Sequence, residues 1–237
     1  MYTFISFIAT PLGILLTFLY GLIQNYGVTL IIFTLIVKLC LYPLYAKQIK
    51  STVRMSEMQP KMKELQRVYA NDKQMLNQKT MELYKKEKFN PASGCLPALL
   101  QLPIIFGLFA LLRDPMRYIE GAEMLIATHQ SFLWVMDLSQ PDPWIFPVGA
   151  GITTFVSFAQ TQAQNKGMND MNQSMASMMK MMKYFFPVMI LVMGRSFPAG
   201  LTMYWFFGMA IQILFNIHLN NVKKKLKAES EKRNRRE

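Results

Sequence analysis

The sequence predicts an all-α polytopic membrane protein with five transmembrane helices around a hydrophilic groove, a cytosolic helical hairpin and an N-terminal interfacial helix. The 237-residue chain is 52% hydrophobic, yet it carries 26 Lys and Arg against 14 Asp and Glu. These residue types are separated into blocks, because residues 1–37 carry no charged side chain and residues 223–237 are mostly charged. So much apolar sequence excludes a disordered polymer, and two cysteines exclude a disulfide-stapled secreted module.

Five apolar windows approach the roughly 20 residues that a membrane-spanning helix needs. They are residues 27–44, 95–112, 144–163, 184–197 and 201–217. The fourth window is short, but it can borrow apolar residues from the methionine-rich segment before it. Only Pro198, Ala199 and Gly200 separate the last two windows, which are therefore expected to form a tight helical hairpin.

The opening stretch, residues 4–23, is predicted to lie in the membrane interface, within an amphipathic segment 1–25. Pro11 divides it, and the part after Pro11 is too short to span the membrane. A spanning segment is the alternative, and no cleaved signal is expected. A weakly polar stripe near helical spacing favours the interfacial reading. Its members are Ser6, Thr10, Gly13, Thr17 and Gln24.

The distribution of Lys and Arg predicts an N-terminus outside the cell and a C-terminus in the cytosol. Segments 46–90, 113–142, 164–183 and 219–237 carry net charges of +6, −3, +2 and +5. Positive segments alternate with the negative one, as five spans require. Arg195 on the outer side and Lys38 inside the first span complete the net charge of +12.

The expected units are therefore the interfacial segment 1–25, a first span 26–45, a cytosolic hairpin 46–90, a four-span remainder 95–218 and a basic cytosolic tail 219–237. Two apolar stripes, separated by a turn at Asn71-Asp72, predict the hairpin, since two independent helices would leave both stripes uncovered. The first stripe is Met55, Met58, Met62, Leu65 and Tyr69, and the second is Met75, Leu76, Leu83 and Tyr84.

No motif indicates an enzyme, so no catalytic residue, cofactor or metal is expected. No Gly-rich loop ends in Gly-Lys-Ser/Thr, and no nucleophile elbow surrounds a serine. His129 and His218 are isolated, and Cys40 and Cys95 lack nearby ligand partners.

Lys38 is the most informative residue, because it falls about 16 Å along the first span at a rise of ~1.5 Å per residue. A lysine near the bilayer centre costs roughly 2.5–3.5 kcal/mol and must be compensated. It could snorkel to the cytosolic interface, or it could face a wet groove between helices. Polar residues on three spans favour the groove: Thr34, Gln101, Thr153, Ser157, Gln160 and Gln164. Such a groove suits the polar segment of a client protein, and a small transporter or channel is the alternative.

Two further features are predicted on the cytosolic side. A methionine face at helical spacing is either a pliable core or a capture surface for apolar client segments. It comprises Met168, Met171, Met175, Met178 and Met182. The basic tail can attract anionic lipid, contact the phosphates of ribosomal RNA, or both. Its basic residues include Lys223, Lys224, Lys225, Lys227, Arg233, Arg235 and Arg236.

Four motifs occur in order between residues 11 and 217. The first is Ile31-Ile32-Phe33-Thr34-Leu35-Ile36-Val37-Lys38 with Tyr42-Pro43-Leu44, and the second is Leu83-Tyr84-Lys85. The third and most specific motif comprises Asn90-Pro91, Gly94-Cys95-Leu96-Pro97 and Gln101-Leu102-Pro103-Ile104. The fourth is Pro198-Ala199-Gly200-Leu201 with Tyr204-Trp205. With these motifs the chain resembles the YidC/Oxa/Alb family of membrane protein insertases, in the short Gram-positive type that lacks a large extracytoplasmic domain.

The resemblance implies an insertase and folding chaperone whose five-helix core surrounds a groove open to the cytosol and to lipid and sealed outside. Tyr204 and Trp205 would belong to that groove, and nascent membrane proteins would be the clients. The ribosome is an expected partner through the basic tail, and the Sec translocon is a possible one. No DNA and no small-molecule substrate are expected. The family usually has an arginine at the position of Lys38, and lysine keeps its charge but loses the planar, multi-donor fork. If bidentate recognition of a client carboxylate matters, activity is altered.

Overall fold

The computed structural model describes residues 2–87, 96–113, 117–118, 122–164 and 173–234, and over these ranges the chain is helical apart from turns and two isolated β-bridges. The helices are α1 (Tyr2–Ile23), α2 (Tyr26–Val68), α3 (Lys73–Lys86), α4 (Leu96–Arg113), α5 (Ala122–Ala127), α6 (Ile145–Gln164), α8 (Gln173–Gly194) and α9 (Ala199–Asn234). The all-α class is confirmed.

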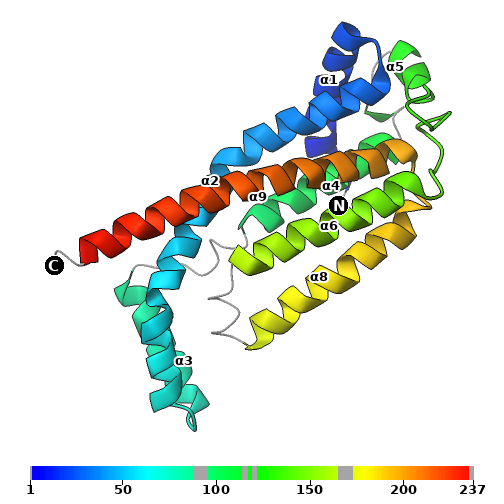
Figure 1. Cartoon of the computed structure of the whole chain (residues 1–237). Coiled ribbons are helices and arrows are strands. Elements are labelled where there is room, and N and C mark those ends of the chain that lie inside the picture. Colours follow the sequence, from blue (N-terminus) through cyan, green and yellow to red (C-terminus); the bar gives the residue numbers. More distant parts are fainter. Residues whose placement is uncertain (1, 88–95, 114–116, 119–121, 165–172, 235–237) are drawn as a thin grey trace.

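α9 is the central helix of the bundle. It packs against α2 on one side and α6 on the other, and α6 in turn packs against α8. Figure 1 shows α8, α6, α9 and the first part of α2 side by side with similarly inclined axes, and α8 runs antiparallel to the other three. α1 packs on α4 and α2 at a steep angle to them. The buried apolar core joins α1, α2, α4 and α9, with fully buried side chains that include Leu16, Phe33, Leu108 and Met203.

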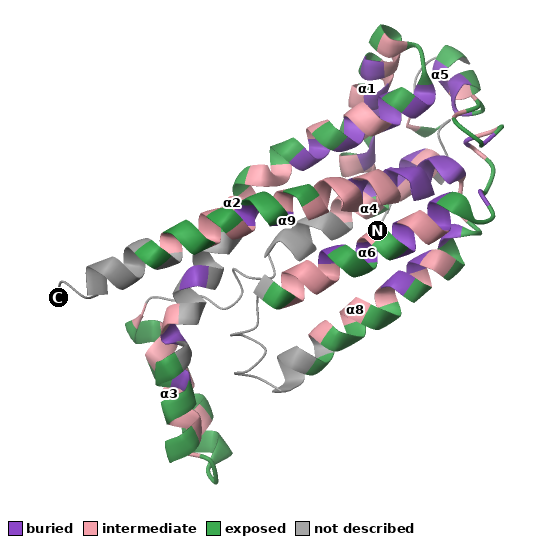
Figure 2. Cartoon of the chain, in the orientation of Figure 1, coloured by how far each residue is buried: buried purple, intermediate pink, exposed green. Residues whose placement is uncertain are grey.

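Exposed residues occur along the helices of the bundle (Figure 2). Many of them are large and apolar, and examples from several helices include Leu39, Phe106, Ile152, Val188 and Leu214. Soluble monomers rarely expose so much contiguous apolar surface. These faces are suited to contact lipid, as expected of a multi-pass membrane protein.

Among the described residues, three helices are long and apolar enough to cross a membrane: Ser6–Ile23, Tyr26–Lys47 and Ala199–Leu226. The last two contain the first and fifth predicted spans. The apolar part of α4, Pro103–Leu112, is shorter. α6 and α8 have 20 and 22 residues, which is enough length for a span, but glutamines near the end of α6 and two lysines in α8 lower their mean hydropathy. The count of five spans stays a prediction.

The expectation that Pro11 divides the opening stretch is wrong. α1 is continuous over 22 residues, with Pro11 inside it. A proline in a helix removes one backbone hydrogen bond, and the tight packing of α1 on α4 offsets that loss. The packing is close because α4 presents Gly107, where an added Cβ would lie 2.9 Å from Cγ2 of Ile8.

Three helices extend beyond their predicted limits. α2 runs for 43 residues and contains Pro43 and Pro60, so the boundary expected at residue 45 falls inside a helix that bends (Figure 1). α9 runs for 36 residues, so the last span and most of the tail are one helix. α8 already begins at Gln173, and the methionine-rich segment from there on belongs to this helix rather than to a loop. α9 begins at Ala199, so the last tight turn precedes it.

α3 folds back along the second half of α2. Met62 of α2 is buried against Leu65, Leu83 and Tyr84, whereas Met75 is exposed. Nζ of Lys61 lies 2.6 Å from Oε1 of Glu87, and this hydrogen bond holds the pKa of the Glu87 carboxyl below its usual value. These contacts join the two helices in antiparallel orientation.

Asp72 should control the stability of α3, because its side chain accepts a hydrogen bond from the amide of Met75 at 2.9 Å and so caps the helix. We predict that Asp72→Ala destabilises α3 by about 1 kcal/mol, which corresponds to a roughly fivefold faster amide hydrogen exchange across α3. Asp72→Asn keeps the acceptor and should exchange like the wild type. Equal exchange in Asp72→Ala would contradict the capping role.

Candidate functional site

Lys38 lies at the interface between α2 and α9 and is only 2% exposed. Its Nζ donates a hydrogen bond to Oε1 of Gln212 on α9, at 3.3 Å. The ring centroid of Tyr45, on the same helix as Lys38, lies 6.0 Å from Nζ. No carboxylate of the described chain lies within ion-pair distance of this ammonium. The structure therefore keeps a cation between two apolar helices with neutral partners.

α9 has a glycine where it passes Thr34 and Lys38 of α2. An added Cβ at Gly208 would lie 3.6 Å from both Cε of Lys38 and Cγ2 of Thr34. Thr34 is fully buried, one turn before Lys38, and its hydroxyl donates to the carbonyl of Leu30 at 2.6 Å. Thr34 and Lys38 thus share the face of α2 that contacts α9, as their spacing predicts.

The other side of α9 contacts a polar face of α6. Thr154 is fully buried and accepts a hydrogen bond from Nε1 of Trp205 at 3.2 Å, and Ser157 is 3% exposed. Thr153, which the sequence singled out, instead donates to the carbonyl of Gly149 at 2.8 Å, one turn earlier in its own helix. The hydroxyl of Thr154 is therefore bonded to α9 and that of Thr153 to its own helix, because adjacent residues of a helix point about 100° apart.

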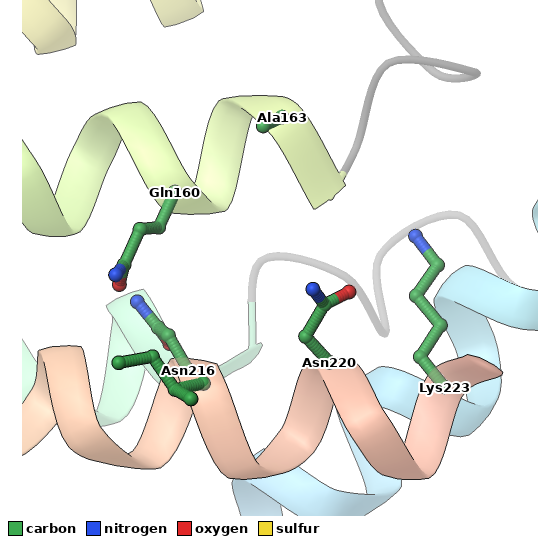
Figure 3. A pocket seen from close by; sticks show the side chains of 6 residues that line it. Gln160, Ala163, Asn216, Asn220 and Lys223 are labelled. Atoms are coloured by element: carbon green, nitrogen blue, oxygen red, sulfur yellow. The ribbon is translucent and has the colours of Figure 1, made fainter. Parts of the chain in front are cut away.

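A cavity of about 240 Å³, lined mostly by residues with polar side chains, lies between α6 and α9 (Figure 3). We call it the α6–α9 cavity. It is lined by Gln160, Ala163, Asn216, Ile217, Asn220 and Lys223. Oε1 of Gln160 is buried and has no hydrogen-bond partner within the described ranges. A buried polar atom of this kind is costly unless water or another polar group satisfies it, so the cavity is suited to a polar occupant.

Two amides link Lys38 to the α6–α9 cavity, although Lys38 does not line that cavity. Nε2 of Gln212 donates to Oδ1 of Asn216 at 3.1 Å, one turn further along α9, and Asn216 lines the cavity. We call Gln212 and Asn216 the amide relay. The sequence interpretation missed both residues, although polar side chains four residues apart in an otherwise apolar window are a signal that could have found them.

The structure does not place the remaining groove candidates together at one site. Tyr204 is buried in the core, 6.5 Å from Phe33 between ring centroids, on the α2 side of α9. The ring of Trp205 lies 6.0 Å from that of Phe186 on α8. Gln101 belongs to α4, but its side chain lies outside the described part, as does that of Gln164.

Most of the proposed cytosolic contact residues also lie outside the described side chains. Met182 is half-buried on α8; Met175 and Met178 belong to that helix, but their side chains are not described, and Met168 and Met171 lie outside the described residues. Lys223 lines the α6–α9 cavity, and Lys224 and Lys225 are exposed. The side chains of Lys227 and Arg233 are not described, and Arg235 and Arg236 lie beyond the described ranges.

Residues 128–142, which we call the outer cap, close the end of the bundle where α2 and α9 begin. Oε1 of Gln130 accepts from the amide of Tyr26 at 2.8 Å, and its Nε2 donates to the hydroxyl of Tyr20 at 2.8 Å. The amides of Ala199 and Gly200 donate to the carbonyls of Gln140 and Leu138. The outer cap thus ties together α1, α2 and α9.

Asp142 connects the outer cap to α6. This residue is 4% exposed, and its carboxylate accepts hydrogen bonds from the amide of Phe146 at 2.6 Å and from Nε1 of Trp134 at 3.4 Å. A carboxylate at a helix N-terminus satisfies free amides and favours the helix dipole. Beside it, the guanidinium of Arg195 lies 4.1 Å from the ring centroid of Trp144. The sequence interpretation missed Asp142, whose position just before an apolar helix is the usual signal of a cap.

Residues 18–227 match the family model described as 60Kd inner membrane protein. The chain belongs to this family, that of the YidC and Oxa insertases. The predicted family and the multi-pass membrane character are thereby confirmed.

Two bacterial members named membrane protein insertase YidC illustrate the similarity. The protein of Fusobacterium nucleatum is 42% identical over 193 residues, covering 81% of this chain and 84% of the relative. The protein of Oceanobacillus iheyensis is 40% identical over 216 residues, covering 89% and 81%. These relatives are named for insertion rather than for a catalytic reaction.

A solved structure has the same fold. It is described as an active YidC insertase with the first transmembrane domain resolved, and it matches with a TM-score of 0.55 and 29% identity. The match covers 90% of this chain but 44% of that chain, so the present chain spans less than half of the solved protein. The two share this family's helical core.

The outer cap should be sensitive to acid through Asp137. Partial burial raises the pKa of Asp137, but hydrogen bonds from Ser139 and His129 outweigh this effect and hold it below the usual value. A carboxyl with a depressed folded-state pKa stabilises the fold above its unfolded pKa of about 3.9, and this contribution is lost as the pH falls further. We predict that Asp137→Asn reduces the drop in thermal stability between about pH 5 and pH 3, measured in detergent. An unchanged pH profile would contradict this role.

Proposed function

We propose that the protein is a membrane protein insertase and folding chaperone that moves short polar segments of client proteins past Lys38 and releases their apolar helices into lipid. The observation that carries this proposal is the buried Lys38 ammonium, which has no carboxylate partner in the described chain and is linked by amides to a polar cavity. The names of the relatives support it, since each is a membrane protein insertase.

The proposed topology has five spans, α2, α4, α6, α8 and α9, with α1 in the outer interface. The α2–α3 hairpin and the end of α9 then lie in the cytosol, as the distribution of Lys and Arg favours. The steep inclination of α1 to the other helices supports its interfacial placement (Figure 1). The outer cap seals the groove on the far side, and the α6–α9 cavity, which Lys223 lines, faces the cytosol.

In the proposed mechanism a client's polar segment enters from the cytosol, attracted in part by the charge of Lys38. Polar backbone groups are costly in hydrocarbon because no water satisfies them. A polar groove between α2, α9 and α6 shortens the hydrocarbon path that the segment must cross. The client's apolar helix meanwhile moves along the outer faces of α6 and α9 into lipid. Hydrophobic partitioning supplies the driving force, and the membrane potential adds about 2.3 kcal/mol per client charge per 100 mV.

Client capture is assigned to the cytosolic side. The α2–α3 hairpin and the methionines of α8 offer apolar surface to client segments, since methionine adapts to varied partners. The basic end of α9 holds ribosomes or anionic lipid nearby, and the Sec translocon is a possible partner.

The charge of Lys38 should be required for one class of client. We predict that Lys38→Ala lowers the insertion of clients with acidic leading segments about tenfold in reconstituted vesicles, a loss of roughly 1.4 kcal/mol, whereas Lys38→Arg preserves it. Insertion that is unchanged in Lys38→Ala would indicate that Lys38 only snorkels. Solute or ion flux that the same substitution abolishes would instead support a small transporter or channel.

The basic tail has its own test. Deletion of residues 223–237 should weaken ribosome co-sedimentation, and the wild-type interaction should itself fall steeply as salt rises, because phosphate contacts release counterions. If the deletion leaves co-sedimentation unchanged at every salt concentration, the tail serves only to orient the protein in the membrane.

A further inference from the structure

We propose that Gln212, oriented by Asn216, is a positioning residue for the Lys38 ammonium, and that its neutral amide determines which client charges the groove accepts. This inference rests on the proposed insertase function. It assigns a role in client specificity to two residues of α9 that carry no charge.

The hydrogen bonds fix the orientation of the Gln212 amide. Its Oε1 accepts from Nζ of Lys38 at 3.3 Å, while its Nε2 donates to Oδ1 of Asn216 at 3.1 Å. A flipped amide would place its NH2 group against the ammonium and its oxygen against the oxygen of Asn216, so both contacts would become repulsive. Asn216 is 6% exposed and sits one turn from Gln212, and it therefore holds the amide in the orientation that lysine requires.

A neutral hydrogen-bond partner preserves the net charge at Lys38, whereas a carboxylate would not. An aspartate or glutamate beside Lys38 would neutralise its charge and occupy it in an ion pair. An ammonium has three donors, and the amide of Gln212 takes one of them while leaving the net charge intact. The charge of Lys38 thus stays uncompensated and can attract an incoming anion, such as the carboxylate of a client's leading segment.

The geometry also places Gln212 on the path from the cavity to Lys38. Asn216 lines the α6–α9 cavity, and Gln212 is the next polar residue of α9 toward Lys38. At Gly208, a further turn along, an added Cβ would lie 3.6 Å from Cε of Lys38, so the lysine stem passes close to α9 there. A polar segment leaving the cavity therefore meets the amide relay before the ammonium.

The contact itself can be tested without any insertion assay. We expect solid-state NMR of the full chain in lipid bilayers to show a dipolar contact between the 15Nζ of Lys38 and the side-chain 13Cδ of Gln212, and this contact should vanish in Gln212→Met. A wild-type spectrum that lacks the contact would overturn the positioning role, whatever the insertion activity.

The role in specificity is tested with paired clients whose leading segments are acidic or neutral. Gln212→Glu should lower insertion of the acidic client on the order of tenfold, because a new carboxylate next to Lys38 cancels its charge, while insertion of the neutral client is retained. Gln140→Glu makes the same change at an exposed side chain of the outer cap and should leave both clients unaffected.

Exchanging the residues at positions 38 and 212 should restore the insertion of the acidic client. Lys38→Gln alone should lose the acidic client, and Lys38→Gln combined with Gln212→Lys should restore it, since the cation then occupies the same contact from the opposite helix. The inference would be overturned if Gln212→Glu affected both clients equally. It would also be overturned if the protein with both Lys38→Gln and Gln212→Lys folded but did not insert the acidic client. Failure of the wild type to insert either client would refute the proposed function, whereas the NMR contact would still report on the positioning of Lys38.

Discussion

The rest of the structure depends on one constraint, the placement of the Lys38 ammonium between apolar helices. A buried charge is tolerated only with polar partners arranged around it. α9 provides such a partner through Gln212, whose amide accepts the hydrogen bond of Lys38. On its opposite side, α9 meets the polar residues Thr154, Ser157 and Gln160 of α6. The central helix therefore has polar neighbours on two faces.

The two ends of the bundle are built differently. At one end the outer cap fixes the starts of α2 and α9 through Gln130 and through backbone hydrogen bonds to Ala199 and Gly200. At the other end α2 and α9 continue for several turns past the bundle, and the α6–α9 cavity lies between helices rather than under a cap. Within the described ranges, the hydrogen bonds that join the ends of different helices gather at the outer cap, which agrees with the proposed groove with one entrance.

The helices and the position of Lys38 could be predicted from local sequence, whereas the contacts between distant segments could not. Thr34 and Lys38 share a face because they lie one turn apart, and this needs no partner to be known. The amides of Gln212 and Asn216 resemble ordinary contacts between membrane helices, so their link to Lys38 became visible only when α2 and α9 were placed side by side. Likewise, local sequence does not define which of the adjacent residues Thr153 and Thr154 is hydrogen-bonded to α9. The hydrogen bond between Gln130 and Tyr26 joins residues 104 positions apart, which no local pattern encodes.

The central claim is that this chain inserts client proteins by itself. The most direct measurement uses purified protein in sealed vesicles that contain no translocon, with protease protection of a client's leading segment as the readout and empty vesicles as the control. The account predicts that the leading segment becomes protected in the protein-containing vesicles well above the empty-vesicle level. Protection equal to that of empty vesicles, together with improved assembly of helices that are already inserted, would contradict it and would identify a chaperone that does not insert.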